Sequence, residues 1–111
     1  MKRDPLPTGQ IDLLLLSILG RGPAHGYAVT EALKLLSGGT FDLPEGTVYP
    51  ALYRLERAGL LASAEQVVAG RRRRVYRLTR TGRARLGTKS EAWRALVRDV
   101  ENVLGHESPR G

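Results

Sequence analysis

The chain has 111 residues, which suffices for one domain with one modest hydrophobic core. Its 18 lysines and arginines against 11 aspartates and glutamates give a formal charge of +7, and this excess favours a polyanionic partner. The absence of cysteine excludes disulfides and thiolate chemistry, and it fits a reducing, cytoplasmic compartment.

The N-terminal segment predicts an arm and a helix. Residues 1–7 are polar, contain two prolines and predict a flexible arm. Thr8 is the expected N-cap of a first helix, in which apolar residues recur every three or four positions. The apolar run at 11–19 predicts no membrane span, because a span needs about 20 apolar residues. Leu13 and Leu16 lie off the main stripe, so we expect a second subunit to cover another side of this helix.

Two more helices are expected at about 25–36 and from Gly46 or Thr47 to the helix-ending Gly59. The third helix has an inward apolar stripe and an opposite face typical of a helix in a DNA major groove. The residues of that face are Thr47, Tyr49, Pro50, Tyr53, Arg54 and Arg57. We weight Arg57 least, because the first residues of a recognition helix usually contact the bases. For Tyr49 and Tyr53 the alternative is packing within the protein, and for Arg57 it is a contact with solvent or a nearby acid.

A basic hairpin follows the third helix. Alternating apolar residues predict strands at about 61–66 and 75–78, joined by a turn at about 68–73. No acidic residue occurs between Glu65 and Glu91, an interval with eight arginines and one lysine. The expected wing tip holds Arg71, Arg72, Arg73 and Arg74. There we expect phosphate contacts more than base contacts, and the alternative is a solvated basic surface.

A second phosphate contact is expected where the second helix begins. Backbone N–H groups near Gly26 and the hydroxyl of Tyr27 lie at the positive end of that helix. His25, directly before them, fits a helix cap or a packing residue better than a catalytic group.

Thr79 or Thr81 is the expected cap of a last helix that reaches about Leu104. Its apolar residues have a heptad-like spacing and are expected to pair with a second copy of the chain. These interface residues are Trp93, Leu96, Val97, Val100, Val103 and Leu104. The predicted fold is mainly α with a small β-hairpin: a winged helix-turn-helix of order α-α-α-β-β-α with a long C-terminal dimerisation helix. We assign 1–80 to the DNA-binding domain and 81–111 to the dimerisation helix and tail.

No pattern indicates a catalytic or metal site. The segment 82–90 comes near a phosphate-binding loop, but a threonine intervenes before its lysine. His25 and His106, the two histidines, lie far apart in the sequence and do not predict a zinc site. No nucleophile and base occur together. We therefore expect a protein that is not an enzyme and that has no cofactor and no metal.

Several motifs together resemble the PadR family of bacterial transcriptional regulators. They are Leu13-Leu-Leu-Leu16, Gly22-Pro-Ala-His-Gly-Tyr27, Gly46-Thr-Val-Tyr-Pro-Ala-Leu-Tyr-Arg-Leu-Glu56, Gly59-Leu60 and Tyr76-Arg-Leu-Thr79-x-x-Gly82. The resemblance covers residues 11 to about 104, and the chain length is similar to that of the short subfamily with a single C-terminal helix.

The resemblance implies a cytoplasmic homodimeric repressor that binds an inverted repeat in double-stranded DNA and is associated with the nucleoid when bound. It implies that the last helix packs against the N-terminal and C-terminal helices of the partner. In multidrug-sensing members an aromatic residue at the place of Trp93 flanks an interfacial pocket for planar compounds. Trp93 is thus a candidate contact for a small aromatic effector, with plain dimer packing as the alternative. The alternative function is a winged-helix module for protein–protein interaction without specific DNA readout.

Overall fold

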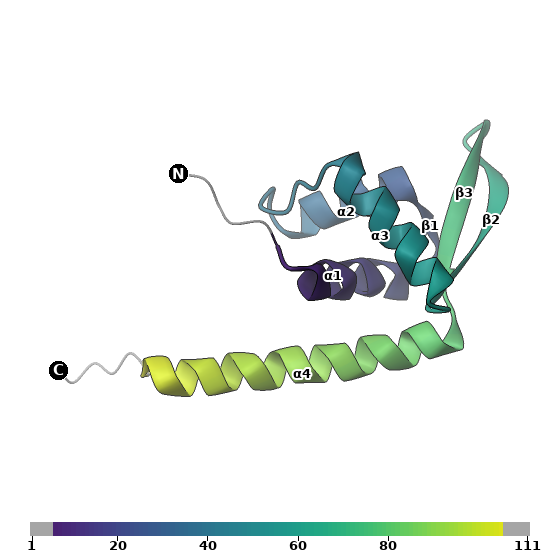
Figure 1. Ribbon diagram of the computed structural model, residues 1–111. Coiled ribbons are helices and arrows are strands. Elements are labelled where there is room, and N and C mark those ends of the chain that lie inside the picture. Colours follow the sequence, from purple (N-terminus) through teal and green to yellow (C-terminus); the bar gives the residue numbers. More distant parts are fainter. Residues whose placement is uncertain (1–5, 106–111) are drawn as a thin grey trace.

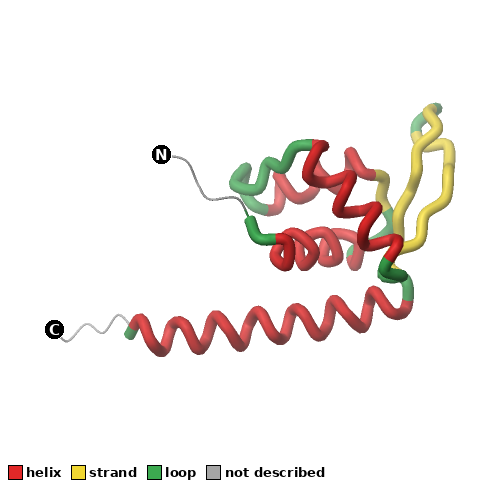
Figure 2. The backbone as a smooth tube through the Cα atoms, viewed as in Figure 1, coloured by secondary structure: helices red, strands yellow, loops and turns green. Residues whose placement is uncertain are grey.

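The computed structural model describes residues 6–105 as four helices and a three-stranded sheet (Figures 1 and 2). The elements are α1 (Thr8–Gly20), β1 (Ala24–His25), α2 (Gly26–Leu36), α3 (Glu45–Arg57), β2 (Leu61–Val68), β3 (Arg71–Leu78) and α4 (Arg80–Leu104). Helices α1, α2 and α3 pack together, and the β2–β3 hairpin projects from one end of them (Figure 1). The predicted winged helix-turn-helix with a long last helix is confirmed. Most of the predicted N-terminal arm, residues 1–5, lies outside the described residues.

The sheet has one strand more than the sequence predicted. Its order is β1-β3-β2, and both pairs of neighbours are antiparallel. The short β1 pairs Ala24 with Tyr76 and His25 with Val75. Two residues are too few to show an alternating pattern, so no sequence signal marked this strand. Its effect is to fix the beginning of α2 beside the hairpin.

The core forms where the inner faces of the first three helices meet the base of the hairpin. Helix α3 contributes the predicted stripe of Val48, Ala51, Leu52 and Leu55, all of them buried. Leu16 of α1 is also part of this core and is fully buried. It offers no surface to a second subunit, so its prediction as an interface residue is wrong. Leu13 is half-buried and lies on the side of α1 that faces α4.

The helix ends differ in part from those predicted. Thr8 is the first residue of α1, and the N-cap is Pro7, whose carbonyl accepts from the N–H groups of Gln10 and Ile11. His25 caps α2, because its Nδ1 accepts from the N–H of Ala28 at 3.3 Å. Helix α3 begins at Glu45, one residue before the expected start.

The first turn of α4 is locked to the winged helix. The hydroxyl of Thr79 accepts from the N–H of Gly82 at 2.9 Å and donates to the carbonyl of Gly59 at 2.7 Å. Gly82 is buried against the backbone carbonyl of Leu60, with no room there for a Cβ. From this anchor α4 runs beside α1 for part of its 25 residues, and its far end extends past the other helices (Figure 1).

Replacing Gly82 with alanine should therefore destabilise the fold, because the new methyl group overlaps the Leu60 carbonyl. We expect a loss of roughly 2 to 3 kcal/mol in the free energy of unfolding, measured by urea denaturation. Gly87 in the same helix has open space at its Cβ position and serves as the control. Gly87→Ala should gain about 0.5 to 1 kcal/mol from helix propensity. Equal stability of the Gly82→Ala protein and the unaltered protein would contradict the described packing.

Candidate nucleic-acid interface

The exposed side of α3 is an unbroken ridge. Gly46, Pro50, Tyr53 and Arg57 recur every three or four residues, and all four are exposed. Tyr53 is 58% exposed, so the alternative that it packs within the protein is excluded. The guanidinium of Arg57 lies 5.7 Å from the centre of the Tyr53 ring and donates to its hydroxyl at 3.3 Å. Arg57, the last residue of α3, thus lies on the same exposed surface as Tyr53.

Two other predicted contacts lie on the flank of α3 next to α2. Tyr49 is 39% exposed, and its ring lies directly on Gly26, where a Cβ would collide with it. Gly26 is buried beneath that ring, whereas Tyr27 beside it is 53% exposed. The beginning of α2 therefore adjoins α3, and the Tyr27 hydroxyl lies at the surface there. Thr47, near the start of α3, is half-buried.

Arg54 is paired within the chain. Its two terminal nitrogens each donate to one carboxylate oxygen of Asp12 in α1, both at 2.9 Å. The hydrogen bond and the charge of Asp12 raise the pKa of Arg54 above its usual value against the opposing effect of burial. The guanidinium fork that was expected to read a base edge is therefore occupied by an acid of the first helix.

The four arginines of the hairpin lie in a strand and not in a loop at its tip. Strand β3 begins at Arg71, and the connecting turn is only Ala69 and Gly70. Both turn residues have positive φ, at 51° and 79°, as a tight two-residue hairpin turn requires. The predicted turn at 68–73 was too long, because a run of four charged residues hides the alternation by which a strand is predicted.

Strand alternation divides the arginines into two pairs with different partners. On one side Arg72 donates to Glu65 at 2.6 Å, and Arg74 lies 3.8 Å from the same carboxylate. Arg74 also donates to the hydroxyl of Ser63, which in turn donates to Glu56 of α3 at 2.8 Å. This chain of hydrogen bonds joins the hairpin to α3.

On the other side are Arg71 and Arg73, which form no ion pair within residues 6–105. Burial, and next the charge of Arg73, lower the pKa of His25 at the cap of α2. Arg73 thus lies close to the positive end of α2, and its Nε has no hydrogen-bond partner in the described chain. Its cation and the start of α2 together form a local site for negative charge.

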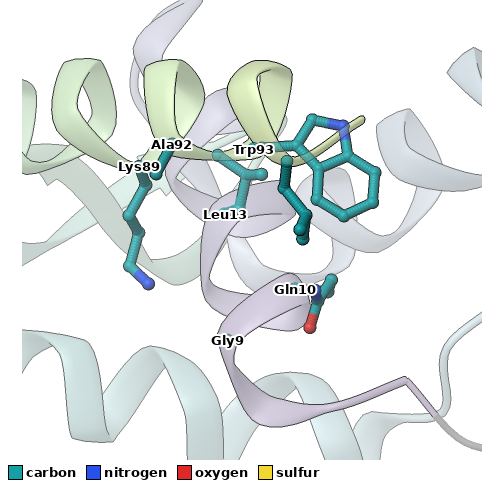
Figure 3. A pocket seen from close by; sticks show the side chains of 7 residues that line it. Gly9, Gln10, Leu13, Lys89, Ala92 and Trp93 are labelled. Carbon is teal, nitrogen blue, oxygen red and sulfur yellow. The ribbon is translucent and has the colours of Figure 1, made fainter. Parts of the chain in front are cut away.

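A hollow of about 210 Å³ lies between α1 and α4 (Figure 3). Leu13 lies between the two helices, with Lys89 on one side of it and the Trp93 ring on the other. Farther along α4 the predicted interface residues are uncovered, with exposed fractions from 38% for Val97 to 86% for Val103. The complete exposed set is Trp93, Leu96, Val97, Val100, Val103 and Leu104.

Comparison with known proteins identifies the family. The model of the transcriptional regulator PadR-like family matches residues 15–88, which include the core, α3 and the hairpin. The chain belongs to this PadR-like family. Members are transcriptional regulators, so the expectation that this protein is not an enzyme is confirmed.

Individual PadR-like relatives agree with this assignment over most of the chain. The chain is 42% identical to "Transcriptional regulator Rv3488" of Mycobacterium tuberculosis over 87 residues, 78% of each protein. The structure is similar to that of smu.1704 from Streptococcus mutans, with a TM-score of 0.83, 28% identity and coverage of 96% and 97% of the two chains. A PadR family regulator from Clostridium difficile is 35% identical, with a TM-score of 0.74 and coverage of 86% and 98%.

Sequence reasoning missed the acidic partners of the arginines in α3 and in the hairpin. Asp12 and Glu65 lie 42 and 7 residues from the arginines that they contact, and no local motif joins them. Within residues 6–105 no three potential metal ligands cluster. In the same part of the chain no helix has the length and apolar character to cross a membrane.

Proposed function

We propose that the protein is a homodimeric repressor that binds an inverted-repeat operator in double-stranded DNA. The observation that supports this best is the junction of three elements on one surface: the α3 ridge, the arginine hairpin and the start of α2. Hydrogen bonds from Ser63 to Glu56 and from Arg74 to Ser63 hold the hairpin against α3. The protein would act in the cytoplasm and associate with the nucleoid when bound.

Base contacts are assigned to the α3 ridge. Pro50 and Tyr53 present apolar surface for a thymine methyl group, and Arg57 presents a guanidinium for a guanine edge. Thr47 and Tyr49 lie beside the ridge near the start of the helix, where they reach the edge of the groove. This surface is small, so one copy of it reads only a half-site.

Phosphate contacts are assigned to the hairpin and to α2. Within residues 6–105 Arg71 and Arg73 have no acidic partner, and we assign them to phosphate together with the start of α2 at Gly26 and Tyr27. Arg72 and Arg74 share the charge of Glu65, and their contribution to binding is correspondingly smaller.

The dimer is supported by the uncovered apolar side of α4. A helix whose Trp93, Leu96 and Val100 are 41%, 49% and 45% exposed leaves in water an apolar surface that pairing would bury. The 25 residues of α4 span about 37 Å, long enough to hold two recognition helices one DNA turn apart. Leu13 continues this surface onto α1.

We also propose that the dimer interface binds a small aromatic effector. A hollow of 210 Å³ is smaller than most sites for drug-sized ligands, so a second subunit would complete it around Trp93. An effector releases DNA only if it binds more tightly to the dimer geometry that does not fit the operator.

Trp93, the one tryptophan of the chain, reports on this site by its fluorescence. We expect saturable quenching by anilinonaphthalene sulfonate, a planar aromatic anion, because its ring contacts the indole and its sulfonate is attracted to Lys89. Lys89→Ala should weaken the quenching. Quenching that rises linearly without saturation would show collisions and no site, which leaves Trp93 as dimer packing.

Replacing Arg71 and Arg73 with alanine tests the DNA surface. Duplex binding should weaken. The slope of log affinity against log salt concentration should become shallower by about one for each phosphate that the two protomers no longer neutralise. Mobility shifts over a series of salt concentrations measure this, with the region upstream of the protein's own gene as duplex. Arg98→Ala is the control. It removes a cation near the C-terminal end of α4, away from the hairpin, and should leave the salt dependence of binding unchanged.

An unchanged salt slope in the double hairpin variant would refute the phosphate assignment. Wild-type protein that binds every duplex equally, or none, would instead favour the alternative function as a protein–protein interaction module.

A further inference from the structure

We propose that Arg54 does not read DNA but positions the recognition helix through Asp12 of α1. This inference rests on the proposed DNA-binding function and assigns one residue of its surface a different task. It also explains why the arginine nearest the middle of α3 is engaged with an acid of the protein itself.

The geometry of the pair leaves Arg54 little freedom. Two hydrogen bonds of equal length, 2.9 Å, join the guanidinium fork to both oxygens of one carboxylate. The Asp12 side chain is only 13% exposed, so solvent competes weakly for its oxygens. A two-point contact of this kind fixes orientation as well as distance. To reach a base edge, Arg54 would have to give up both bonds and leave Asp12 unpaired.

The position of Arg54 on α3 also favours a structural task. Arg54 lies around the helix between the buried Ala51, three residues before it, and the outward-facing Pro50, four residues before it. Its side chain is 47% exposed and reaches Asp12 of α1. The guanidinium is therefore held at the edge of the ridge that borders α1.

Within residues 6–105 Arg54 is one of two side chains that tie α3 to other elements by side-chain hydrogen bonds. Glu56 accepts from Ser63 of the hairpin, whereas Arg54 donates to Asp12 of the first helix. The N-cap Pro44 makes no side-chain hydrogen bond, so the beginning of α3 has no comparable side-chain cap. These directed polar contacts tie α3 to two different elements and add to the orientation that its buried apolar stripe already gives. The two contacts therefore help to set which side chains the ridge presents to a groove.

Removing the charge of Asp12 distinguishes positioning from direct readout, because the two ideas predict opposite changes. A carboxylate near the DNA surface repels phosphate, so Asp12→Asn should strengthen binding if Arg54 merely needs to be free. If Arg54 acts through Asp12, the same substitution should weaken binding and reduce the preference for the operator.

The experiment uses a duplex enriched from a random-sequence pool by the wild-type protein, and a shuffled duplex of equal composition. We expect Asp12→Asn and Arg54→Gln each to weaken binding to the selected duplex about tenfold, because the dimer carries each change twice. Binding to the shuffled duplex should weaken much less. The double variant should be no weaker than Arg54→Gln alone, since both changes remove the same pair of hydrogen bonds. Asp42→Asn is the matched control: among residues 6–105 this acid pairs with Lys34 alone, at 3.8 Å, and its removal should preserve the preference.

Thermal unfolding of every variant precedes the binding assay. If Asp12→Asn is unfolded at the assay temperature, the exchanged variant Asp12→Arg with Arg54→Asp takes its place. If the exchanged variant binds the selected duplex more tightly than Arg54→Asp alone, the result supports positioning by the ion pair. If the two variants bind equally weakly, the proposal is overturned.

Two results would overturn the proposal and leave the DNA-binding function standing. One is unchanged or tighter binding of Asp12→Asn with weakened binding of Arg54→Gln, which would make Arg54 a direct contact. The other is unchanged binding of both variants. A wild-type protein without preference for any selected duplex would overturn the proposed function itself.

Discussion

Helix α1 is the element from which the functional surfaces are positioned, because it is covered on two sides. One side contributes Leu15, Leu16 and Leu19 to the common core with α2, α3 and the sheet. The other side faces α4 and contacts it through Leu13. Asp12, directly beside Leu13, is hydrogen-bonded to Arg54 of α3, the helix that we assign to base contacts. A displacement of α1 would therefore change both the helix that faces DNA and the helix that we assign to the dimer.

The two sides of the hairpin differ in their charge. Glu65 neutralises part of the cationic field of Arg72 and Arg74 and fixes their orientation. The arginines on the opposite side of β3 form no ion pair with any acid of the described part of the chain. A strand with four unpaired cations would repel itself and lose stability. The single acid reduces that repulsion on the side that joins α3. We therefore assign most of the phosphate contacts to the side without that acid.

The sequence predicted those parts of the fold that follow from local pattern. Period-3.6 apolar stripes located α1, α3 and α4, and the motifs of the PadR family connected them correctly. Patterns could not show that Leu16 belongs to the core, because a helix that is apolar on all sides does not reveal which neighbour covers which side. Nor could they reveal the strand nature of 71–74, where charge masks alternation, or the two-residue strand β1. The pairing of Arg54 with Asp12 joins residues 42 positions apart, which only the folded chain brings together.

The central claim is that α4 pairs two recognition surfaces at the spacing of one DNA turn. Hydroxyl-radical footprinting of the selected duplex, with the wild-type protein and with Val100→Glu at the apolar side of α4, tests it most directly. We expect two protected segments on one face of the duplex, about 10 base pairs apart from centre to centre. Val100→Glu should lose this paired pattern, because a charge in the interface opposes dimer formation. One uninterrupted protected segment for the wild-type protein, or the same paired footprint for Val100→Glu, would contradict the claim.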